Sequence, residues 1–518
     1  MRRSVIVIIC ATAGAVAGVL AIALLGAARH PTAMRAAPQL AAAGPASAAQ
    51  PRVETLPCWF PVPAGRSARC GRLIVPEDWD DLSSRSLALR FVVFPGSQGD
   101  AAEPLIYVSG GPGEPAQIDA AGIGRWWQWT SDSDWLGRRD LVVFDQRGVG
   151  LSEPDLGCPE LVQVGPKLFT AALGAAETDA AWADAATRCH RRLAAAGVRL
   201  DRYNTAATVR DIAALVGGLQ YRHWSFLAVS YGTRVVFEFL RQYPDGTRSA
   251  ILDSVLPPGV RPYLSAGTDA ARALDLLVAG CMAEPGCKSA NPDLGRALAD
   301  IVQRAALHPL AVPLPAAGDP GRRAMLDDAK LVEVLFYGLY RKRDIKRLPD
   351  VITALARGNV GPLAPLAAEA LETYESAALS HGLYLSVECH DEYPFDPPEA
   401  VRRAAAAAGR FEHFVLANVP VAACPVWPVG AASDGSQAPV ASDVPILMLS
   451  GELDPVTPPE WAKTAAATLS HARLFRFPEV GHGVLAADRC ADRVVASFLA
   501  KPDQAPFDHC LLALGQAR

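Results

Sequence analysis

Residues 227–233 read Leu-Ala-Val-Ser-Tyr-Gly-Thr, between an apolar run that starts at His223 and a stretch with helical spacing. A serine at such a strand-to-helix turn is typical of a nucleophile elbow, which lifts the hydroxyl out of the sheet. The residues two before and two after Ser230 are the small Ala228 and Gly232, where larger side chains would clash. The N-terminus of the following helix can stabilise negative charge on a bound substrate. The stretch predicts a nucleophilic Ser230; an ordinary buried serine after a strand is the alternative.

A glycine-rich loop follows the short apolar strand expected at 105–108. Residues 109–113 read Ser-Gly-Gly-Pro-Gly. Glycines allow the backbone to approach a ligand and leave N–H groups free to point at it. We expect an oxyanion hole made of one N–H from Gly110 or Gly111 and one from Tyr231. A plain Gly-Pro turn is the alternative for this loop.

A second polar loop follows the compact apolar strand expected at 141–144. Residues 145–152 read Asp-Gln-Arg-Gly-Val-Gly-Leu-Ser. We interpret this segment as scaffolding, in which an Asp–Arg pair and glycine turns hold the loops beneath the site.

Two further polar segments follow short apolar strands near the C-terminus. The strand expected at 445–449 leads to Asp454, and the strand expected at 474–478 leads to His482 between two glycines. An imidazole can remove a hydroxyl proton, and a carboxylate fixes the imidazole tautomer and stabilises its cation. Ser…Asp…His is also the chain order of the α/β-hydrolase fold. The sequence therefore predicts a catalytic triad of Ser230, Asp454 and His482.

The acid of this triad has one rival. Asp253 follows the strand-like residues 250–252. Asp454 is favoured because it precedes a proline-rich helix start and lies shortly before His482 in the chain.

The segments SGGPG, DQRGVGLS, AVSYGT, GELDPVTP and EVGHG together resemble the α/β-hydrolase peptidases of the prolyl aminopeptidase and secreted tripeptidyl aminopeptidase group. The resemblance implies that Ser230 is the nucleophile, His482 the base and later the acid, and Asp454 the orienting carboxylate. The chain departs from the group at Ser109, where histidine or glycine is usual, and at Ala228, where glycine is usual. Neither change removes a catalytic group.

Strands alternate with helical segments on both sides of a long helical region, which predicts an α/β-hydrolase fold. We expect a mostly parallel central sheet flanked by helices, built from residues 51–256 and 426–518. Between them, residues 257–425 show helical spacing of apolar residues and few strand-like runs. This segment is expected to form an inserted helical lid that closes the pocket and selects the substrate.

Composition excludes several function classes. The 49 Lys and Arg against 54 Asp and Glu give a net charge of −5, and the basic residues do not cluster, so nucleic-acid binding has no support. No Cys/His spacing resembles a zinc site, and the glycine-rich loop lacks the Lys-Ser/Thr of a phosphate-binding loop. We therefore expect no metal and no cofactor.

The N-terminus indicates export. A short basic start precedes an almost wholly apolar run, so residues 1–28 are expected to form a signal peptide, and 29–50 an Ala/Pro-rich linker. The apolar run is also long enough to cross a bilayer, so a retained membrane anchor is the alternative.

Cysteine usage agrees with export, because ten cysteines follow this region and an even count favours disulfides in an oxidising compartment. Connectivity does not follow from sequence alone, but pairing neighbours would staple five local loops. The expected pairs are Cys58–Cys70, Cys158–Cys189, Cys281–Cys287, Cys389–Cys424 and Cys490–Cys510.

The expected lid contains an acidic segment with Glu388, Asp391 and Glu392. The resemblance implies that acidic groups hold a free substrate amine, and such carboxylates could do so by charge-assisted hydrogen bonds. A solvated acidic loop is the alternative, and Glu114, just after the oxyanion loop, is a second candidate. Three tryptophans either line the pocket or belong to the core, which is the commoner case: Trp126, Trp127 and Trp129.

The sequence thus predicts an exported serine hydrolase with an acyl-enzyme mechanism. The resemblance makes a short peptide the expected substrate, cut near a free N-terminus by an aminopeptidase of prolyl or tripeptidyl type. A carboxylesterase acting on small or lipid-like esters uses the same machinery and is the enzymatic alternative. A non-catalytic hydrolase-like binding protein is a further alternative, disfavoured by the complete triad. Contact with a membrane is expected only through the possible anchor.

Overall fold

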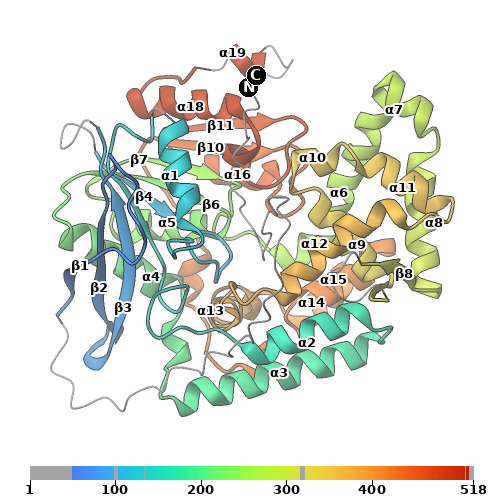
Figure 1. The fold of residues 1–518 in the computed structure, drawn as a ribbon, viewed down its shortest axis with the longest axis horizontal. Coiled ribbons are helices and arrows are strands. Elements are labelled where there is room, and N and C mark those ends of the chain that lie inside the picture. The colour runs from blue at the N-terminus through green and yellow to red at the C-terminus, as the bar shows by residue number, and fades with distance from the viewer. Residues whose placement is uncertain (1–49, 98–102, 134, 315–320, 508, 513–518) are drawn as a thin grey trace, which may run out of the picture.

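A nine-stranded sheet is built from the first and last parts of the chain (Figure 1). The structure is a computed structural model that describes residues 50–97, 103–133, 135–314, 321–507 and 509–512. In spatial order the strands are β1 (Arg52–Leu56), β2 (Arg69–Asp78), β3 (Asp81–Phe94), β5 (Leu141–Phe144), β4 (Leu105–Val108), β6 (Trp224–Val229), β7 (Thr247–Asp253), β10 (Ile446–Gly451) and β11 (Ala472–Phe477). From β5 to β11 all neighbours are parallel, whereas β1, β2, β3 and β5 pair antiparallel. The sheet is mostly parallel, as the sequence predicts.

Strand β6 illustrates why these apolar runs form buried parallel strands. Phe226 and Ala228 pack into the core on the side of α4 (Thr205–Gly218) and α5 (Tyr231–Gln242). Leu227 and Val229 alternate with them and face the opposite core, which includes residues of α1 (Ile123–Asp132) and α18 (Arg489–Ala500). Both faces are covered, so every position of the strand is buried and all but Ser225 are apolar; the Ser225 hydroxyl hydrogen-bonds that of Ser249 at 2.8 Å. Near the C-terminus, the remaining helices are α16 (Pro459–Ala466), α17 (Val484–Ala487) and α19 (His509–Leu512).

The segment between β7 and β10 is mainly helical and has its own hydrophobic core. Its helices lie to one side of the sheet in Figure 1. They are α6 (Pro262–Ala283), α7 (Pro285–Ala290), α8 (Leu294–Leu307), α9 (Asp328–Gly338), α10 (Lys342–Ile345), α11 (Leu348–Ala356), α12 (Ala364–Glu375), α13 (His381–Val387), α14 (Pro398–Ala407) and α15 (Glu412–Asn418), with a π-helical turn at Glu388–Glu392. The sequence did not predict the antiparallel hairpin of β8 (Leu310–Pro313) and β9 (Arg323–Leu326).

Two helices from before the elbow also join this helical layer. They are α2 (Pro159–Thr170) and α3 (Ala175–Ala195), and α2 packs against α12. Phe169 of α2 belongs to the hydrophobic core of the inserted segment. We therefore propose a lid of two parts, residues 257–425 together with α2 and α3, where the sequence analysis placed only the first part.

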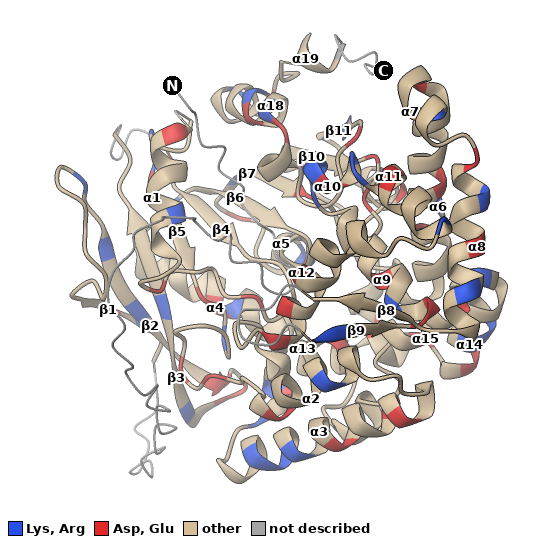
Figure 2. Ribbon diagram, turned by 45° about the vertical axis from the view of Figure 1, so that its right-hand side comes forward, with Lys and Arg blue, Asp and Glu red and all other residues tan. Residues whose placement is uncertain are grey.

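The signal peptide or anchor expected at 1–28, and nearly all of the linker expected at 29–50, lie outside the described residues. Within the described ranges, no helix combines the length and the apolar character needed to cross a bilayer. In Figure 2, basic and acidic residues are interspersed over the ribbon, as the sequence analysis expects.

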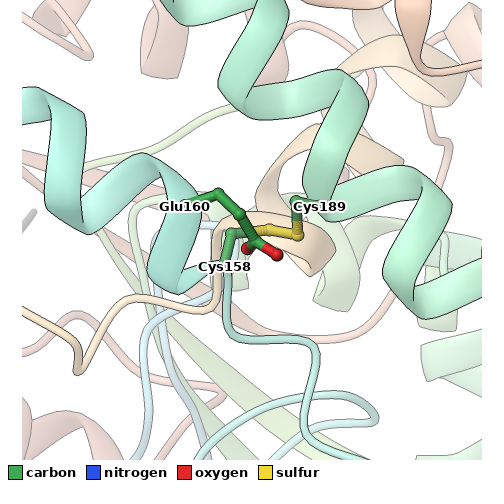
Figure 3. Close-up of side chains that lie close together, drawn as sticks. All are labelled: Cys158, Glu160 and Cys189. Carbon is green, nitrogen blue, oxygen red and sulfur yellow. A yellow bond between two sulfur atoms is a disulfide. The ribbon is translucent and has the colours of Figure 1, made fainter.

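All ten cysteines after the N-terminal region form disulfides, with the pairing that neighbour order predicts. The bonds are Cys58–Cys70, Cys158–Cys189, Cys281–Cys287, Cys389–Cys424 and Cys490–Cys510. Cys158, Cys189 and Glu160 form a compact group whose potential ligand atoms lie within 4.8 Å of one another (Figure 3). The two sulfurs are bonded to each other, and Arg192 Nε donates to Glu160 at 2.7 Å. This group is therefore a disulfide beside an ion pair, with its ligand atoms already engaged.

Candidate active site

The serine lies at a strained turn between β6 and α5. Ser230 has φ of 56° and ψ of −128°, a conformation that non-glycine residues rarely adopt, and it directly precedes the first residue of α5. A Cβ added at Gly232 would overlap the carbonyl oxygen of Val108 and lie 2.8 Å from that of Ser109. Only glycine fits there, so the turn can press against β4. The geometry is that of the elbow predicted from the sequence, with Ser230 at its apex and 6% exposed.

The histidine and the acid meet as the chain order predicts. His482 Nδ1 lies 2.9 Å from Asp454 Oδ2, and both side chains are buried. The other oxygen of Asp454 accepts hydrogen bonds from the N–H groups of Val456 at 2.8 Å and Thr457 at 2.9 Å. The Thr457 hydroxyl donates to Asp454 Oδ2 at 2.8 Å and lies 3.3 Å from His482 Nδ1. Sequence reasoning missed Thr457, although its position three residues after the acid and just before a helix start was visible.

Electrostatics in this pair favour the charged forms of both groups. Burial opposes a charge on His482, but the Asp454 carboxylate and its hydrogen bond outweigh burial and raise the pKa of the imidazole. Burial likewise opposes ionisation of Asp454, but the histidine and the two backbone N–H groups lower the pKa of this carboxyl. A stabilised imidazolium is what a general base needs once it has taken a proton.

The rival acid, Asp253, binds backbone N–H groups of the residues that follow His482. The Asp253 carboxylate accepts hydrogen bonds from the N–H groups of Val484 at 2.8 Å and Leu485 at 2.9 Å. Its carbonyl oxygen accepts from the N–H of Ser230 at 3.0 Å. Asp454 rather than Asp253 therefore accepts the hydrogen bond from the imidazole, and Asp253 ties the elbow to the histidine loop.

The glycine before the histidine packs against the helical layer. A Cβ added at Gly481 would overlap the carbonyl oxygen of Leu339 and lie 2.8 Å from its carbonyl carbon. The next residue of the helical segment, Tyr340, contacts the imidazole with ring centroids 5.1 Å apart. In addition, Arg272 of α6 donates to the carbonyl oxygen of Asp454 at 2.6 Å. The helical layer thus contacts both the base and the acid.

The predicted oxyanion loop lies directly against the serine. A Cβ added at Gly110 would be 3.1 Å from Ser230 Cβ and 3.7 Å from its Oγ. Ser109 Oγ donates to the carbonyl oxygen of Glu114 at 3.1 Å, and Gln146 Nε2 donates to the Ser109 carbonyl at 3.0 Å. The departure at Ser109 is therefore accommodated by hydrogen bonds that brace the loop.

The scaffold segment is held differently from the prediction of an Asp–Arg pair. Asp145 accepts hydrogen bonds from the N–H groups of Ala116 at 2.7 Å and Leu151 at 2.8 Å. Arg147 instead pairs with Asp211 of α4, through two hydrogen bonds of 2.7 and 2.6 Å between fully buried groups. The expected pair within the segment is wrong, because α4 brings a carboxylate that sequence order does not reveal.

The second ring nitrogen of His482 is not engaged by the residues that the structure describes. His482 Nε2 is buried and has no hydrogen-bond partner among the described residues. We propose that this nitrogen accepts the proton of the Ser230 hydroxyl when a substrate binds. In substrate-free enzymes such catalytic hydrogen bonds often tighten only when the substrate binds.

A cavity of about 420 Å³ adjoins these loops. At one end it is lined by Gly111 of the oxyanion loop, Val456 of the acid loop and Tyr340 beside the histidine. Most other lining residues come from the helical layer and include the aromatic residues Trp182, Phe336, Tyr337, Tyr374 and Tyr384. Two buried or partly buried carboxylates line it as well, Glu114 and Glu333.

Of the four carboxylates predicted to bind an amine, only Glu114 lines this cavity. Glu388 accepts a hydrogen bond from the Tyr263 hydroxyl, and burial raises its pKa to about 7. Asp391 Oδ2 accepts from the Thr205 hydroxyl at 2.6 Å, and Glu392 pairs with Arg234 at 3.2 Å. Glu388, Asp391 and Glu392 are therefore held by partners within the protein, and they do not form the solvated acidic loop that was the alternative prediction. Sequence reasoning missed Glu333, which lies on α9 among apolar residues that mark it only as one position of a helix.

The three tryptophans of α1 belong to the core side of the sheet. Trp126 and Trp129 are buried, with ring centroids 5.5 Å apart, and Trp126 packs against Tyr107. Trp127 is half-buried and stacks edge-on against Phe94. None of the three lines the cavity described above, so the core alternative describes them.

Comparisons with known proteins agree with this geometry. The model of the alpha/beta hydrolase fold family matches residues 103–305, and that of the TAP-like protein family matches residues 411–508. Serine protease Hip1 of Mycobacterium tuberculosis is 27% identical over 497 residues, which cover 88% of this chain and 91% of that protein. Carboxylesterase B of the same species is 26% identical over 461 residues, 84% of each chain. Tripeptidyl aminopeptidase of Streptomyces coelicolor is 29% identical over 206 residues, 37% of this chain and 35% of that protein.

These matches span the elbow, the acid and the histidine, and the relatives carry the names of serine hydrolases. The chain is therefore an enzyme of the serine hydrolase class with the α/β-hydrolase fold, and it is similar to α/β-hydrolase serine peptidases.

Proposed function

We propose that this enzyme is an exported aminopeptidase that cleaves short peptides near a free N-terminus. The observation that carries the proposal is the buried Asp454–His482 hydrogen bond beside the strained Ser230 elbow, at the end of a cavity lined by carboxylates. Relatives that are named serine protease or tripeptidyl aminopeptidase support a peptidase. Five disulfides support an oxidising compartment outside the cytosol.

In the proposed reaction Ser230 Oγ attacks the scissile carbonyl while His482 Nε2 takes its proton. The N–H groups of Tyr231 and of Gly110 or Gly111 stabilise the tetrahedral oxyanion. His482 then gives the proton to the leaving amine, which leaves an acyl-enzyme. A water molecule, deprotonated by the same imidazole, hydrolyses the ester and restores the serine.

Asp454 has two roles in this proposal. Its hydrogen bond to Nδ1 fixes the tautomer in which Nε2 can accept a proton, and its charge stabilises the imidazolium. Thr457 helps to orient the carboxylate, because its hydroxyl and its N–H both donate to it.

A carboxylesterase is the second candidate, because one relative bears that name and the acyl-enzyme chemistry is the same. The two functions separate on their substrates. Anilides of short peptides with free and with acetylated N-termini would be compared with simple aryl esters. An aminopeptidase loses most of its anilide activity on acetylation, whereas rapid ester turnover without anilide cleavage would reject the proposal. A protein that turns over neither class would indicate a non-catalytic binding role.

A further inference from the structure

The side chain of Tyr231, the residue after the nucleophile, begins a buried chain of hydrogen bonds that ends in the inserted helical segment. The Tyr231 hydroxyl lies 2.9 Å from Thr205 Oγ1, and Thr205 Oγ1 lies 2.6 Å from Asp391 Oδ2. All three residues are buried. Thr205 is the first residue of α4, and its N–H also donates to Asp391 Oδ2 at 2.9 Å. Three segments that are far apart in the sequence thus meet at one carboxylate.

The protonation of the two end groups fixes the direction of this chain. Burial and the charge of Asp391 raise the pKa of Tyr231, so the tyrosine hydroxyl keeps its proton. Burial opposes ionisation of Asp391, but hydrogen bonds with His390 and Thr205 outweigh burial and lower the pKa of this carboxyl. The threonine hydroxyl has one hydrogen, which it donates to the carboxylate, so it accepts the hydrogen bond of the tyrosine. The charged acceptor at the end strengthens the bonds of the chain.

A second contact ties the first turn of α5 to the same part of the inserted segment. Glu392 pairs with Arg234 at 3.2 Å, and both side chains are buried. Arg234 lies three residues after Tyr231, so the π-helical turn Glu388–Glu392 holds both of these α5 residues. A disulfide at Cys389 anchors the turn itself. Such π-helical turns are rare and are frequent at functional sites.

The glycine-rich loop is held by the other end of the same helical stretch. The Ser380 N–H donates to the carbonyl oxygen of Gly113 at 2.9 Å, and a Cβ added at Gly113 would lie 2.6 Å from the Ser380 carbonyl oxygen. The Ser380 hydroxyl also donates to the carbonyl oxygen of Gly148 at 2.7 Å. Residues 380–392, which comprise α13 and the π-helical turn, therefore contact the glycine loop at one end and the start of α5 at the other.

We propose that residues 380–392 fix the spacing of the two oxyanion donors, and that Asp391 and Thr205 are positioning residues for Tyr231. The Tyr231 N–H stabilises a tetrahedral oxyanion only if the first turn of α5 keeps its direction. The hydrogen bond at the hydroxyl holds the tyrosine ring, and the ring holds the backbone next to this N–H. The inference rests on the proposed acyl-enzyme mechanism. It applies to peptide and ester substrates alike, because both pass through the same oxyanion.

Substitutions of Thr205 test this inference, because its hydroxyl links the tyrosine to the carboxylate. Thr205→Val keeps the shape of the side chain and removes the hydroxyl, whereas Thr205→Ser retains the hydroxyl. The matched control is Thr208→Val on the same helix, since the buried Thr208 hydroxyl has no hydrogen-bond partner among the described residues. A second variant, Tyr231→Phe, removes the donor at the other end of the chain.

Two readouts are compared in every variant. The first is kcat/KM on p-nitrophenyl acetate and on anilides of short peptides with free N-termini. The second is Ki for an aryl trifluoromethyl ketone, which reports on the oxyanion site. The Ser230 oxygen adds to the carbonyl carbon of this ketone, the serine proton passes to His482, and the former carbonyl oxygen becomes the oxyanion. A loss of fold alone would lower Tm without changing these two readouts together.

Thr205→Val should lower kcat/KM by about 10- to 100-fold and raise Ki by a similar factor, because a displaced donor stabilises the oxyanion poorly. Thr205→Ser should stay within about threefold of the wild-type enzyme in both readouts, because the bond is kept. Thr208→Val should change neither readout. Tyr231→Phe should also lose activity, and the double variant with Thr205→Val should lose no more than the worse single variant, since both changes break one chain.

Several results would overturn the inference. Wild-type kcat/KM in Thr205→Val would show that the hydroxyl has no role, and so would equal losses in Thr205→Val and Thr205→Ser. A lower kcat/KM with an unchanged Ki would show that the oxyanion site is intact and that the damage lies elsewhere. If Thr205→Val does not fold, Tyr231→Phe decides, and wild-type values of both readouts in that variant refute the inference. If the wild-type enzyme turns over neither esters nor anilides, the proposed function itself is rejected, and this inference with it.

Discussion

Replacing Gly481 by alanine tests whether the inserted helical layer fixes the position of the catalytic base. The backbone of Gly481 is not in the left-handed region, so only the lack of space excludes a side chain. The added Cβ would lie 2.8 Å from the carbonyl carbon of Leu339 and would overlap its oxygen. Comfortable carbon–carbon contacts are about 3.5–4.0 Å, and the overlap with the oxygen is tighter still, so the loop or the helix end must shift by at least about 1 Å.

The expected cost follows from this shift. A catalytic group displaced by about 1 Å commonly loses around 100-fold in rate, and overpacking a tight contact destabilises by about 1–3 kcal/mol. Gly481→Ala should therefore lower kcat/KM about 100-fold on any cleaved substrate and lower Tm by several degrees. His482 is the next residue, so fluorophosphonate labelling of the serine should slow in proportion.

The matched control is Gly280→Ala in α6, where an added Cβ meets no atom within 4 Å. This change should leave the kinetics unaltered and hold or raise Tm, because alanine is favoured over glycine in helices. If Gly481→Ala keeps more than about one third of wild-type kcat/KM with an unchanged Tm, the contact between helical layer and histidine loop does not position the base.

Asp454→Asn should lower kcat by about 10⁴-fold without unfolding the enzyme, because an amide permits the wrong imidazole tautomer. Asp253→Asn should lower the free energy of unfolding by about 1–3 kcal/mol, and Tm with it, because the partners of this carboxylate are backbone N–H groups. Comparable losses of kcat in Asp454→Asn and Asp253→Asn would contradict these assignments. Activity should fall as pH drops through the pKa of His482, because only the neutral imidazole accepts a proton. This pKa lies above the ordinary value of about 6.5 because the effect of Asp454 outweighs that of burial. In Asp454→Asn the acidic limb of the pH–rate profile of residual activity should move to lower pH, because burial still lowers the pKa of His482 and the carboxylate that raised it is gone. An acidic limb that does not move would show that Asp454 does not set this pKa. Removing the Cys389–Cys424 disulfide, whose cysteines are 35 residues apart, should cost about 4 kcal/mol of stability in denaturant unfolding, and a loss below about 1 kcal/mol would show that the loop is held by other contacts.

Much of the fold follows from local sequence because a parallel sheet buried on both faces needs continuous apolar runs. Strands β4 and β5 have the bounds expected from their apolar residues, and the polar residues that follow such strands gather at one edge of the sheet. This is why Ser230, Asp454 and His482 could be selected although they are far apart in the chain.

Other features depend on how distant elements pack, and local patterns do not carry that information. The partner of Arg147 could not be inferred, because Asp211 reaches it from a separate helix. The place of Glu333 in the cavity likewise depends on where α9 docks beside the histidine loop. The sequence of the acidic segment around Asp391 suggested a ligand site, but in the folded protein Asp391 is held by side chains of the protein itself.

Site-resolved labelling by a fluorophosphonate probe tests the central claim most directly. The probe phosphonylates a serine only when an adjacent base activates it and an oxyanion site accepts the new P–O⁻ group. Mass spectrometry of the digested wild-type enzyme should find the adduct on Ser230, with labelling abolished in Ser230→Ala and strongly slowed in His482→Ala. An unlabelled wild-type enzyme, or an adduct that persists on another residue in Ser230→Ala, would contradict the assignment of the nucleophile.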